Sequence, residues 1–173
     1  MTRRLVALLV VVLVGVTGCS SGKSADEWAG EVCAALGPWK SKIADLNDQG
    51  RRQMLSATST TETLSYLDGL LGGAASASEA ARVRVAAAGV PDVDGGAAVA
   101  ASFVASLTGA RDAYAQARAD LKALPMSDDT QFYDGVVRIM SALNEQYEST
   151  AVDPATLNSP ALKQAFEGSA ACR

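Results

Sequence analysis

The sequence predicts an all-α protein, namely an up-and-down four-helix bundle with a short C-terminal helix. Apolar residues recur at steps of three and four along most of the chain, which places them on one face of each helix. No stretch alternates polar and β-branched residues with the period of two that strands show. Hydrophobic residues make up 49% of the 173 residues, which is enough to form a core.

The first predicted helix covers residues 24–46, with Ser24 as its N-cap. Pro38 removes one backbone hydrogen bond, so we expect a kink at Gly37-Pro38. A polar connection that contains residues 49–53 is expected to follow. The helix has one apolar stripe, formed by Trp28, Val32, Leu36, Trp39, Ile43 and Leu46.

The second predicted helix carries apolar residues at helical spacing from Leu64 to Val85. Its middle, from Gly72 to Ser78, contains only Gly, Ala and Ser, so the helix could continue or break there. We favour one long helix. The turn at residues 89–96 precedes a third helix with the most regular stripe, formed by Val99, Phe103, Leu107, Ala110, Tyr114, Ala117, Leu121 and Leu124.

Pro125 ends the third predicted helix, and Asp128 or Asp129 can cap the fourth. After a second loop, Ser159 caps a short final segment that begins at Pro160 and runs through Ala171. The apolar side of the fourth helix consists of Phe132, Val136, Ile139 or Met140, Leu143 and Tyr147.

The first residues have the features of an export signal. Arg3 and Arg4 precede an apolar run from Leu5 to Val16, which is shorter than the roughly 20 residues of a membrane span. Val16-Thr17-Gly18-Cys19 resembles the lipobox of bacterial lipoproteins. That resemblance implies a diacylglyceryl group on the Cys19 sulfur and cleavage after Gly18. A non-lipidated signal anchor and an ordinary secreted protein are the alternatives.

The lipobox resemblance also implies a domain organisation and a location. Residues 1–18 are then a signal peptide that is removed, residues 19–24 are a lipid-anchored tether, and residues 25–173 are a single helical domain. The mature chain is expected on the outer face of the cytoplasmic membrane, held there by two lipid chains.

Cys33 and Cys172 are the two cysteines left once Cys19 is lipidated. In an oxidising extracytoplasmic compartment they have a single intramolecular pairing, so we predict a Cys33–Cys172 disulfide. Neither residue belongs to a Cys-x-x-Cys motif, and the pair is therefore interpreted as structural rather than redox-active.

Several classes of chemistry are disfavoured by composition. The chain has no His, which removes the Ser/His/Asp triad and the usual catalytic zinc sites. A net charge of −4 argues against nucleic acid as a partner. Asp92, Asp94 and the following glycines could hold Ca²⁺, but we interpret them as a solvated turn. We therefore expect no catalytic residues, metal or cofactor.

Trp28 and Trp39 lie on the same predicted helix face and, with Phe103, could line an apolar pocket. Packing in the bundle core is the simpler interpretation. The early helix with Pro38-Trp39, the Ala-rich middle and the terminal Cys resemble small helical lipoproteins of actinobacterial type, a likeness that implies architecture and location but no activity.

The leading functional hypothesis is a lipid-anchored, non-enzymatic module that binds an unidentified protein of the cell envelope. The alternative is a small-molecule or lipid carrier that holds an apolar ligand inside the bundle. A cavity of at least about 300 Å³ would favour the carrier, whereas a filled core with an exposed apolar patch would favour the binding module.

Overall fold

The computed structural model describes residues 22–150, 152–154 and 157–173. These residues form α-helices and one short 3-10 helix, with no β-strand among them, so the all-α prediction is confirmed. The elements are α1 (Ala25–Ser56), α2 (Thr60–Ala87), α3 (Gly96–Lys122), α4 (Asp129–Thr150), α5 (Pro160–Gly168) and the 3-10 helix η2 (Ala170–Cys172).

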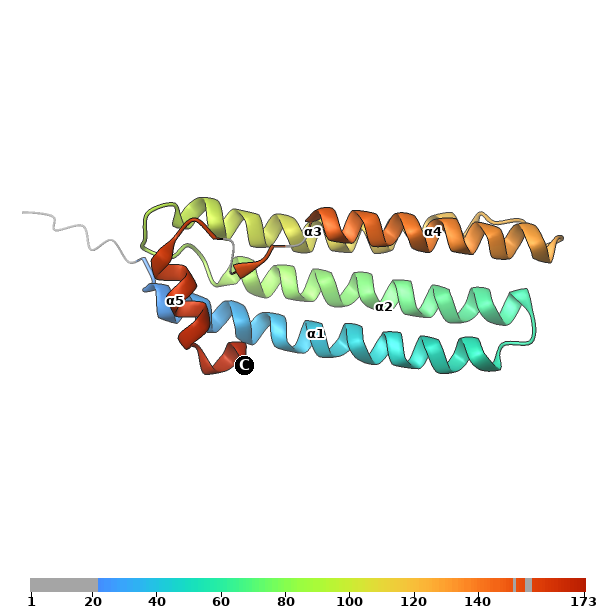
Figure 1. The fold of residues 1–173 in the computed structure, drawn as a ribbon, viewed down its shortest axis with the longest axis horizontal. Helices are drawn as coiled ribbons and strands as arrows, with labels where there is room; N and C mark the ends of the chain where they lie inside the picture. The colour runs from blue at the N-terminus through green and yellow to red at the C-terminus, as the bar shows by residue number, and fades with distance from the viewer. Residues whose placement is uncertain (1–21, 151, 155–156) are drawn as a thin grey trace, which may run out of the picture.

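Helices α1 to α4 run up and down along the long axis of the molecule (Figure 1). Each packs on the next in sequence, and α2 and α3 form the most extensive contact. Helix α5 crosses the end at which α1 begins, and both α5 and η2 pack on α1. Because α4 packs mainly on α3, the edge between α1 and α4 is the least closely packed side of the bundle.

Side-chain caps begin the helices at the positions that the sequence indicates. The Ser24 hydroxyl accepts a hydrogen bond from the Glu27 backbone N–H, and Ser159 accepts one from that of Leu162. Asp128 accepts from the Gln131 N–H at 3.0 Å, so it is Asp128 that caps α4. Pro160 occupies the first turn of α5, as predicted.

The polar connection predicted at residues 49–53 is wrong, because α1 continues through these residues to Ser56. Gly50 is the residue that misleads sequence reasoning, since glycine usually weakens a helix. Here Gly50 is buried against α2, and a Cβ on it would lie 2.5 Å from Leu70 Cδ1. The glycine therefore allows a close approach of two helices rather than a turn.

Helix α2 is continuous through Gly72-Gly73, which confirms the single long helix. Both glycines face neighbouring side chains: a Cβ on Gly72 would lie 3.0 Å from Arg118 Cζ, and one on Gly73 would lie 3.0 Å from Leu46 Cδ2. Helix α1 likewise runs through Pro38 without ending there. The kink expected at Gly37-Pro38 therefore does not divide α1 into two helices.

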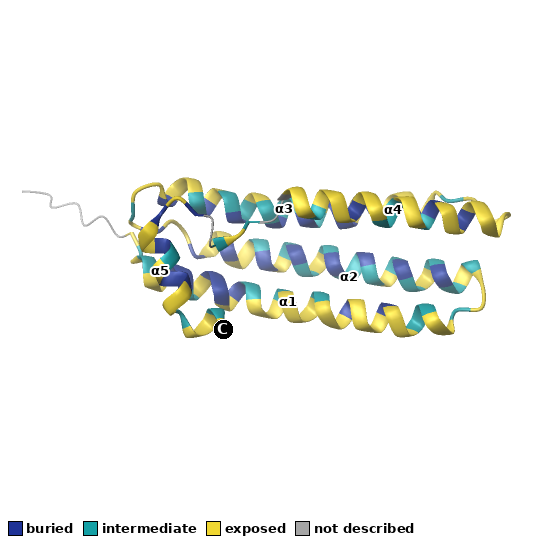
Figure 2. Ribbon diagram, in the orientation of Figure 1, coloured by how far each residue is buried: buried dark blue, intermediate teal, exposed yellow. Residues whose placement is uncertain are grey.

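The buried residues form two clusters that follow one another along the bundle. Figure 2 shows that buried positions recur along the long helices. The first includes Trp28, Phe103, Leu162 and Phe166, and its members come from α1, α2, α3 and the C-terminal segment. The second joins α1, α2 and α3 to α4 and includes Leu143. Helix α5 thus covers one end of the three-helix core, while α4 covers the other.

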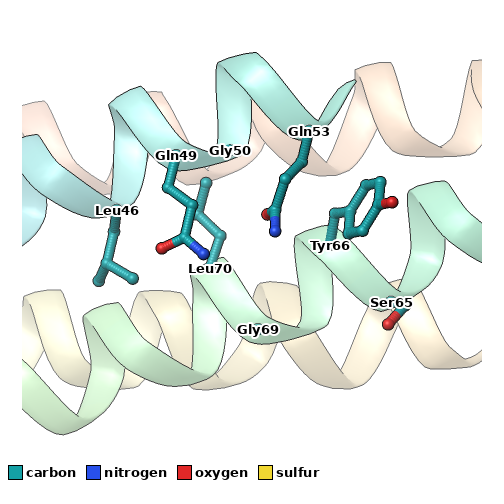
Figure 3. A pocket seen from close by; sticks show the side chains of 8 residues that line it. All are labelled: Leu46, Gln49, Gly50, Gln53, Ser65, Tyr66, Gly69 and Leu70. Carbon is teal, nitrogen blue, oxygen red and sulfur yellow. The ribbon is translucent and has the colours of Figure 1, made fainter. Parts of the chain in front are cut away.

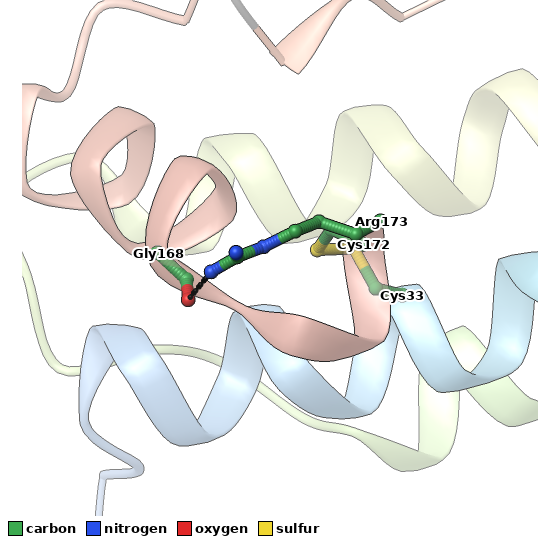
Figure 4. Close-up of a disulfide and its surroundings, with 4 residues drawn as sticks. All are labelled: Cys33, Gly168, Cys172 and Arg173. Atoms are coloured by element: carbon green, nitrogen blue, oxygen red, sulfur yellow. Dashed lines mark hydrogen bonds between the residues drawn. A yellow bond between two sulfur atoms is a disulfide. The ribbon is translucent and has the colours of Figure 1, made fainter.

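The predicted disulfide between Cys33 and Cys172 is present, with the two Cα atoms 5.0 Å apart (Figure 4). It fastens η2 to α1, and the two bonded cysteines are 139 residues apart in the sequence. The Arg173 guanidinium donates a hydrogen bond to the Gly168 carbonyl at 3.2 Å. The last residues of the chain are therefore tied both to α1 and to the end of α5.

Candidate functional site

The described chain begins on the loop between α2 and α3. The Lys23 carbonyl accepts a hydrogen bond from the Asp92 N–H at 2.8 Å, and the Lys23 ammonium pairs with Glu31. Gly22 also lies against Asp92, since a Cβ on this glycine would come 2.5 Å from Asp92 Cβ. Residues 22–24 of the expected tether thus contact the folded body, whereas Cys19 lies outside the described residues.

Trp28 is a core residue with no exposed surface. Its ring makes edge-to-face contacts with Phe103 and Phe166, at centroid distances of 5.7 Å and 5.9 Å. The indole N–H donates to the Gly89 carbonyl at 2.9 Å, which satisfies its only polar atom. This end of the bundle is filled, so Trp28 does not border a cavity.

Trp39 and Phe103 line the same apolar pocket, about 180 Å³ in volume. The Trp39 indole N–H donates to Ser78 Oγ at 3.1 Å, and the Ser78 hydroxyl in turn donates to the Ala74 carbonyl. These bonds fix the indole as one wall of the pocket. The residues around it are Leu36, Trp39, Lys40, Phe103, Ser106, Leu107, Ala110, Tyr147, Val152 and Pro154.

Several residues of this pocket were not expected from the sequence to form a site. Leu107 and Tyr147 fit the apolar stripes of their helices and were expected in the core, and no pattern marks Lys40. These residues meet because the chain beyond the end of α4 passes beside α1 and α3. Burial raises the pKa of the half-buried Tyr147 hydroxyl, which keeps it neutral at physiological pH.

A second hollow lies between α1 and α2 and has a polar lining (Figure 3). Its volume is about 300 Å³, and the amides of Gln49 and Gln53 extend from α1 toward α2. Ser65 and Tyr66 border it on the other side. None of its lining side chains is charged, so it offers hydrogen bonds but no acid or base.

The outer face of α2 and α3 carries a shallow, mainly apolar trough, and Asp112 at one end is the charged residue among those that line it. We define the α2–α3 trough by Val90, Ala97, Ala101, Val104 and Ala105, which are among the residues that line it. The sequence has no charged residue from position 95 to position 110, so the first half of α3 contributes only uncharged side chains. Val90, at the end near the start of the described chain, is 51% exposed.

Ion pairs cross between α2 and α3 beyond the trough. Glu79 accepts from Arg82 at 2.7 Å and from Arg111 at 2.9 Å. Hydrogen bonds from these two guanidinium groups lower the pKa of Glu79 to about 2. This carboxylate is therefore ionised at neutral pH and too weak a base for proton abstraction.

A similar arrangement surrounds Asp68 of α2. Its carboxylate accepts from Arg118 at 2.6 Å and from Lys122 at 2.9 Å. The hydrogen bond from Arg118 outweighs the effect of burial and holds the pKa of Asp68 well below its usual range. Both acidic groups with strongly lowered pKa values thus join α2 to α3, which is a structural role.

The described residues contain neither a metal-binding cluster nor a helix that could span a membrane. In the part of the chain that the structure describes, no three His, Cys, Asp or Glu side chains come close enough together to hold a metal ion. The described helices also include none with the length and apolar character needed to span a bilayer.

Comparisons with protein-family models, curated proteins and solved structures find no match. Functional inference therefore depends on the residues of this chain. The structure brings two of the three predicted aromatic residues to one pocket, pairs the two predicted cysteines, and leaves the predicted lipidation site outside its described part.

Proposed function

We propose that this protein is a lipid-anchored helical module on the outer face of the cytoplasmic membrane that binds another envelope protein and catalyses no reaction. The observation that carries the proposal is the mainly apolar α2–α3 trough, which begins at the end of the bundle where the described chain starts. The lipobox resemblance at residues 16–19 supplies the anchor.

The anchor would hold this end of the bundle close to the membrane. Two residues, Ser20 and Ser21, lie between Cys19 and Gly22, and the three residue-to-residue steps span roughly 10 Å at about 3.3 Å per extended residue. Since Gly22 and Lys23 already contact the α2–α3 loop, a lipid on Cys19 would keep that loop near the lipid headgroups. The trough would then face envelope components within a short distance of the membrane.

The trough favours a partner helix with an uncharged, small-residue face. Ala97, Ala101 and Ala105 are exposed and lie four residues apart, so a second helix could approach the α3 backbone closely. The Asp112 carboxylate at one end of the trough already pairs with Arg111. A charged partner residue along the apolar part of the trough would therefore lose its hydration without meeting an opposite charge. Uncharged surfaces of helical envelope proteins satisfy these conditions.

Photo-crosslinking in intact cells tests the partner surface. A photoreactive amino acid at Ala101, inside the trough, should yield a discrete covalent adduct that mass spectrometry identifies as one envelope protein. The matched control places the same group at Ala119, which is exposed on the charged half of α3. Equal adducts from both positions, or none from Ala101, would contradict the proposal.

Mass spectrometry of the membrane fraction tests the anchor separately. The N-terminal peptide should begin at Cys19 and carry a diacylglyceryl mass. A Cys19→Ala variant should move to the soluble fraction of the envelope. An N-terminus upstream of an unmodified Cys19 would rule out the anchor while leaving the crosslinking result intact.

The carrier alternative has weaker support from the geometry. The pocket beside Trp39 has a volume of about 180 Å³, below the roughly 300–1,000 Å³ of sites that enclose drug-sized ligands. The hollow between α1 and α2 reaches about 300 Å³ but has a polar lining and lies away from the three aromatic residues of the carrier hypothesis. Neither space suits a long lipid chain.

A further inference from the structure

We propose that the pocket beside Trp39 binds a small aromatic carboxylate, with the ring among Trp39, Phe103 and Tyr147 and the carboxylate at Lys40. The inference requires neither the lipid anchor nor the partner proposed above. It rests on the size of the pocket, on its aromatic walls and on the single cation among its lining residues.

The size of the pocket matches one ring rather than an extended chain. Its volume is about 180 Å³, and apolar cavities of about 150 Å³ in other proteins admit a benzene molecule. A single substituted ring therefore fills the space and leaves its substituent at the opening.

The walls are held in place before any ligand arrives. The hydrogen bond to Ser78 fixes the Trp39 ring, and Phe103 is held by stacking on Phe166 at 5.5 Å and by the edge contact with Trp28. Preformed walls reduce the entropy that a ligand must lose on binding. Aromatic walls also suit edge-to-face contacts with a ligand ring.

The charge at the pocket favours an anion. Lys40 is exposed, lines the pocket and forms no ion pair with another described residue. Asp153 lies between the lining residues Val152 and Pro154 but does not itself line the pocket. The ammonium is thus the one charged group among the residues that line the pocket, and a carboxylate is its natural counterpart.

The two tryptophans provide a direct test by NMR of the full-length protein in detergent micelles. The ¹⁵N-labelled protein has two indole N–H signals, which a Trp39→Phe variant assigns. Benzoate should shift the Trp39 signal in a saturable manner and leave the Trp28 signal in place, because Trp28 lies in the filled core. Toluene and benzylamine are titrated in parallel as the neutral and cationic counterparts.

Variants of the two neighbouring lysines separate charge from shape. Lys40→Met should weaken benzoate binding by about 1.5- to fivefold, the range for an exposed ion pair, and should leave toluene binding unchanged. Lys42→Met removes the same charge from an exposed position that does not line the pocket, and it should change neither. Ser106→Leu should fill the pocket and abolish the shift with both ligands.

Each remaining outcome would overturn the inference. A Trp39 signal that does not respond to benzoate rules out the site. Benzylamine binding as tightly as benzoate rules out selection for an anion. An equal loss of benzoate affinity in the Lys40 and Lys42 variants would show attraction by the overall charge of the protein rather than by this pocket.

Discussion

Trp28 and Trp39 show how a residue's position along a helix determines whether it is buried in the core or borders a pocket. Both lie on the apolar stripe of α1, and the sequence pattern predicts a pocket-lining position for either one equally well. Trp28 lies where α5 covers α1 and is completely buried. Trp39 lies farther along α1, where the chain leaves α4, and remains half-buried. Helical periodicity identifies the face of a residue but not which neighbouring element covers it.

We predict that Trp28→Ala lowers the free energy of unfolding by about 3–5 kcal/mol, because it removes a buried ring and leaves a cavity beside Phe103 and Phe166. Denaturant titration followed by circular dichroism measures the change. Leu55→Ala is the control, since Leu55 is 89% exposed and its truncation should cost less than about 0.5 kcal/mol. Equal effects of the two substitutions would refute the assignment of Trp28 to the core.

The lowered pKa of Glu79 should make the free energy of unfolding depend on pH in the acid range. Its pKa falls from 4.5 to about 2 on folding, so its ion pairs stabilise the folded protein fully above pH 4.5. That stabilisation is lost as the pH decreases from 4.5 toward about 2. Glu79→Gln should therefore be less stable than the wild type at neutral pH, and the difference should disappear near pH 2.

Urea denaturation midpoints across this pH range measure the effect of Glu79→Gln. Glu145→Gln is the control for net charge, because it also removes one negative charge but lies on an exposed position of α4. A constant difference between wild type and Glu79→Gln from neutral pH to pH 2 would contradict the role of the carboxylate.

At the scale of the helices, the sequence predicts their number, order and caps but not every boundary. Ser24, Asp128 and Ser159 mark helix starts through local hydrogen bonds, and these are visible in sequence. The last third of α1 was missed because residues 49–53 are polar and include Gly50, whereas in the structure Gly50 is buried in the helix beside Leu70. A tertiary contact of this kind has no local signature.

Glycine substitutions give a matched test at this scale. Gly69→Ala should stabilise the protein by about 0.5–1 kcal/mol, because Gly69 is exposed inside α2 and nothing lies within 4 Å of an added Cβ. Gly96→Ala should destabilise it, since a Cβ there would lie 2.3 Å from the Pro91 carbonyl oxygen. Thermal melts of the two variants should shift in opposite directions, and a shared direction would refute the packing described for the start of α3.

At the scale of the whole molecule, the bundle is built in two sections. Three long helices run its length, and α5 and α4 cover different ends of their shared core. The sequence predicts both covering helices, but it does not predict that α4 packs mainly on α3. The pocket beside Trp39 depends on how these elements pack, so no sequence motif marks it.

Reduction of the Cys33–Cys172 disulfide should lower the melting temperature by roughly 8–20 °C. Closing a loop of this length stabilises the folded state by about 4–5 kcal/mol in the chain-entropy description, and each kcal/mol corresponds to about 2–4 °C at this size. Scanning calorimetry with and without reductant measures the shift. A variant with Ser at both positions should not respond to reductant, and two alkylatable thiols in the unreduced protein would disprove the pairing.

The same disulfide determines how the molecule would respond to pulling. If a partner held on α3 pulls against a lipid anchor, tension enters the folded body at Gly22 and reaches Cys33 early in α1. From there it divides, because one covalent path continues along α1 and the other crosses the disulfide to Cys172 and returns through α5 and α4. Each path carries only part of the force. The C-terminal segment, which would bear no tension in an uncrosslinked chain, thereby helps the bundle to resist mechanical extension.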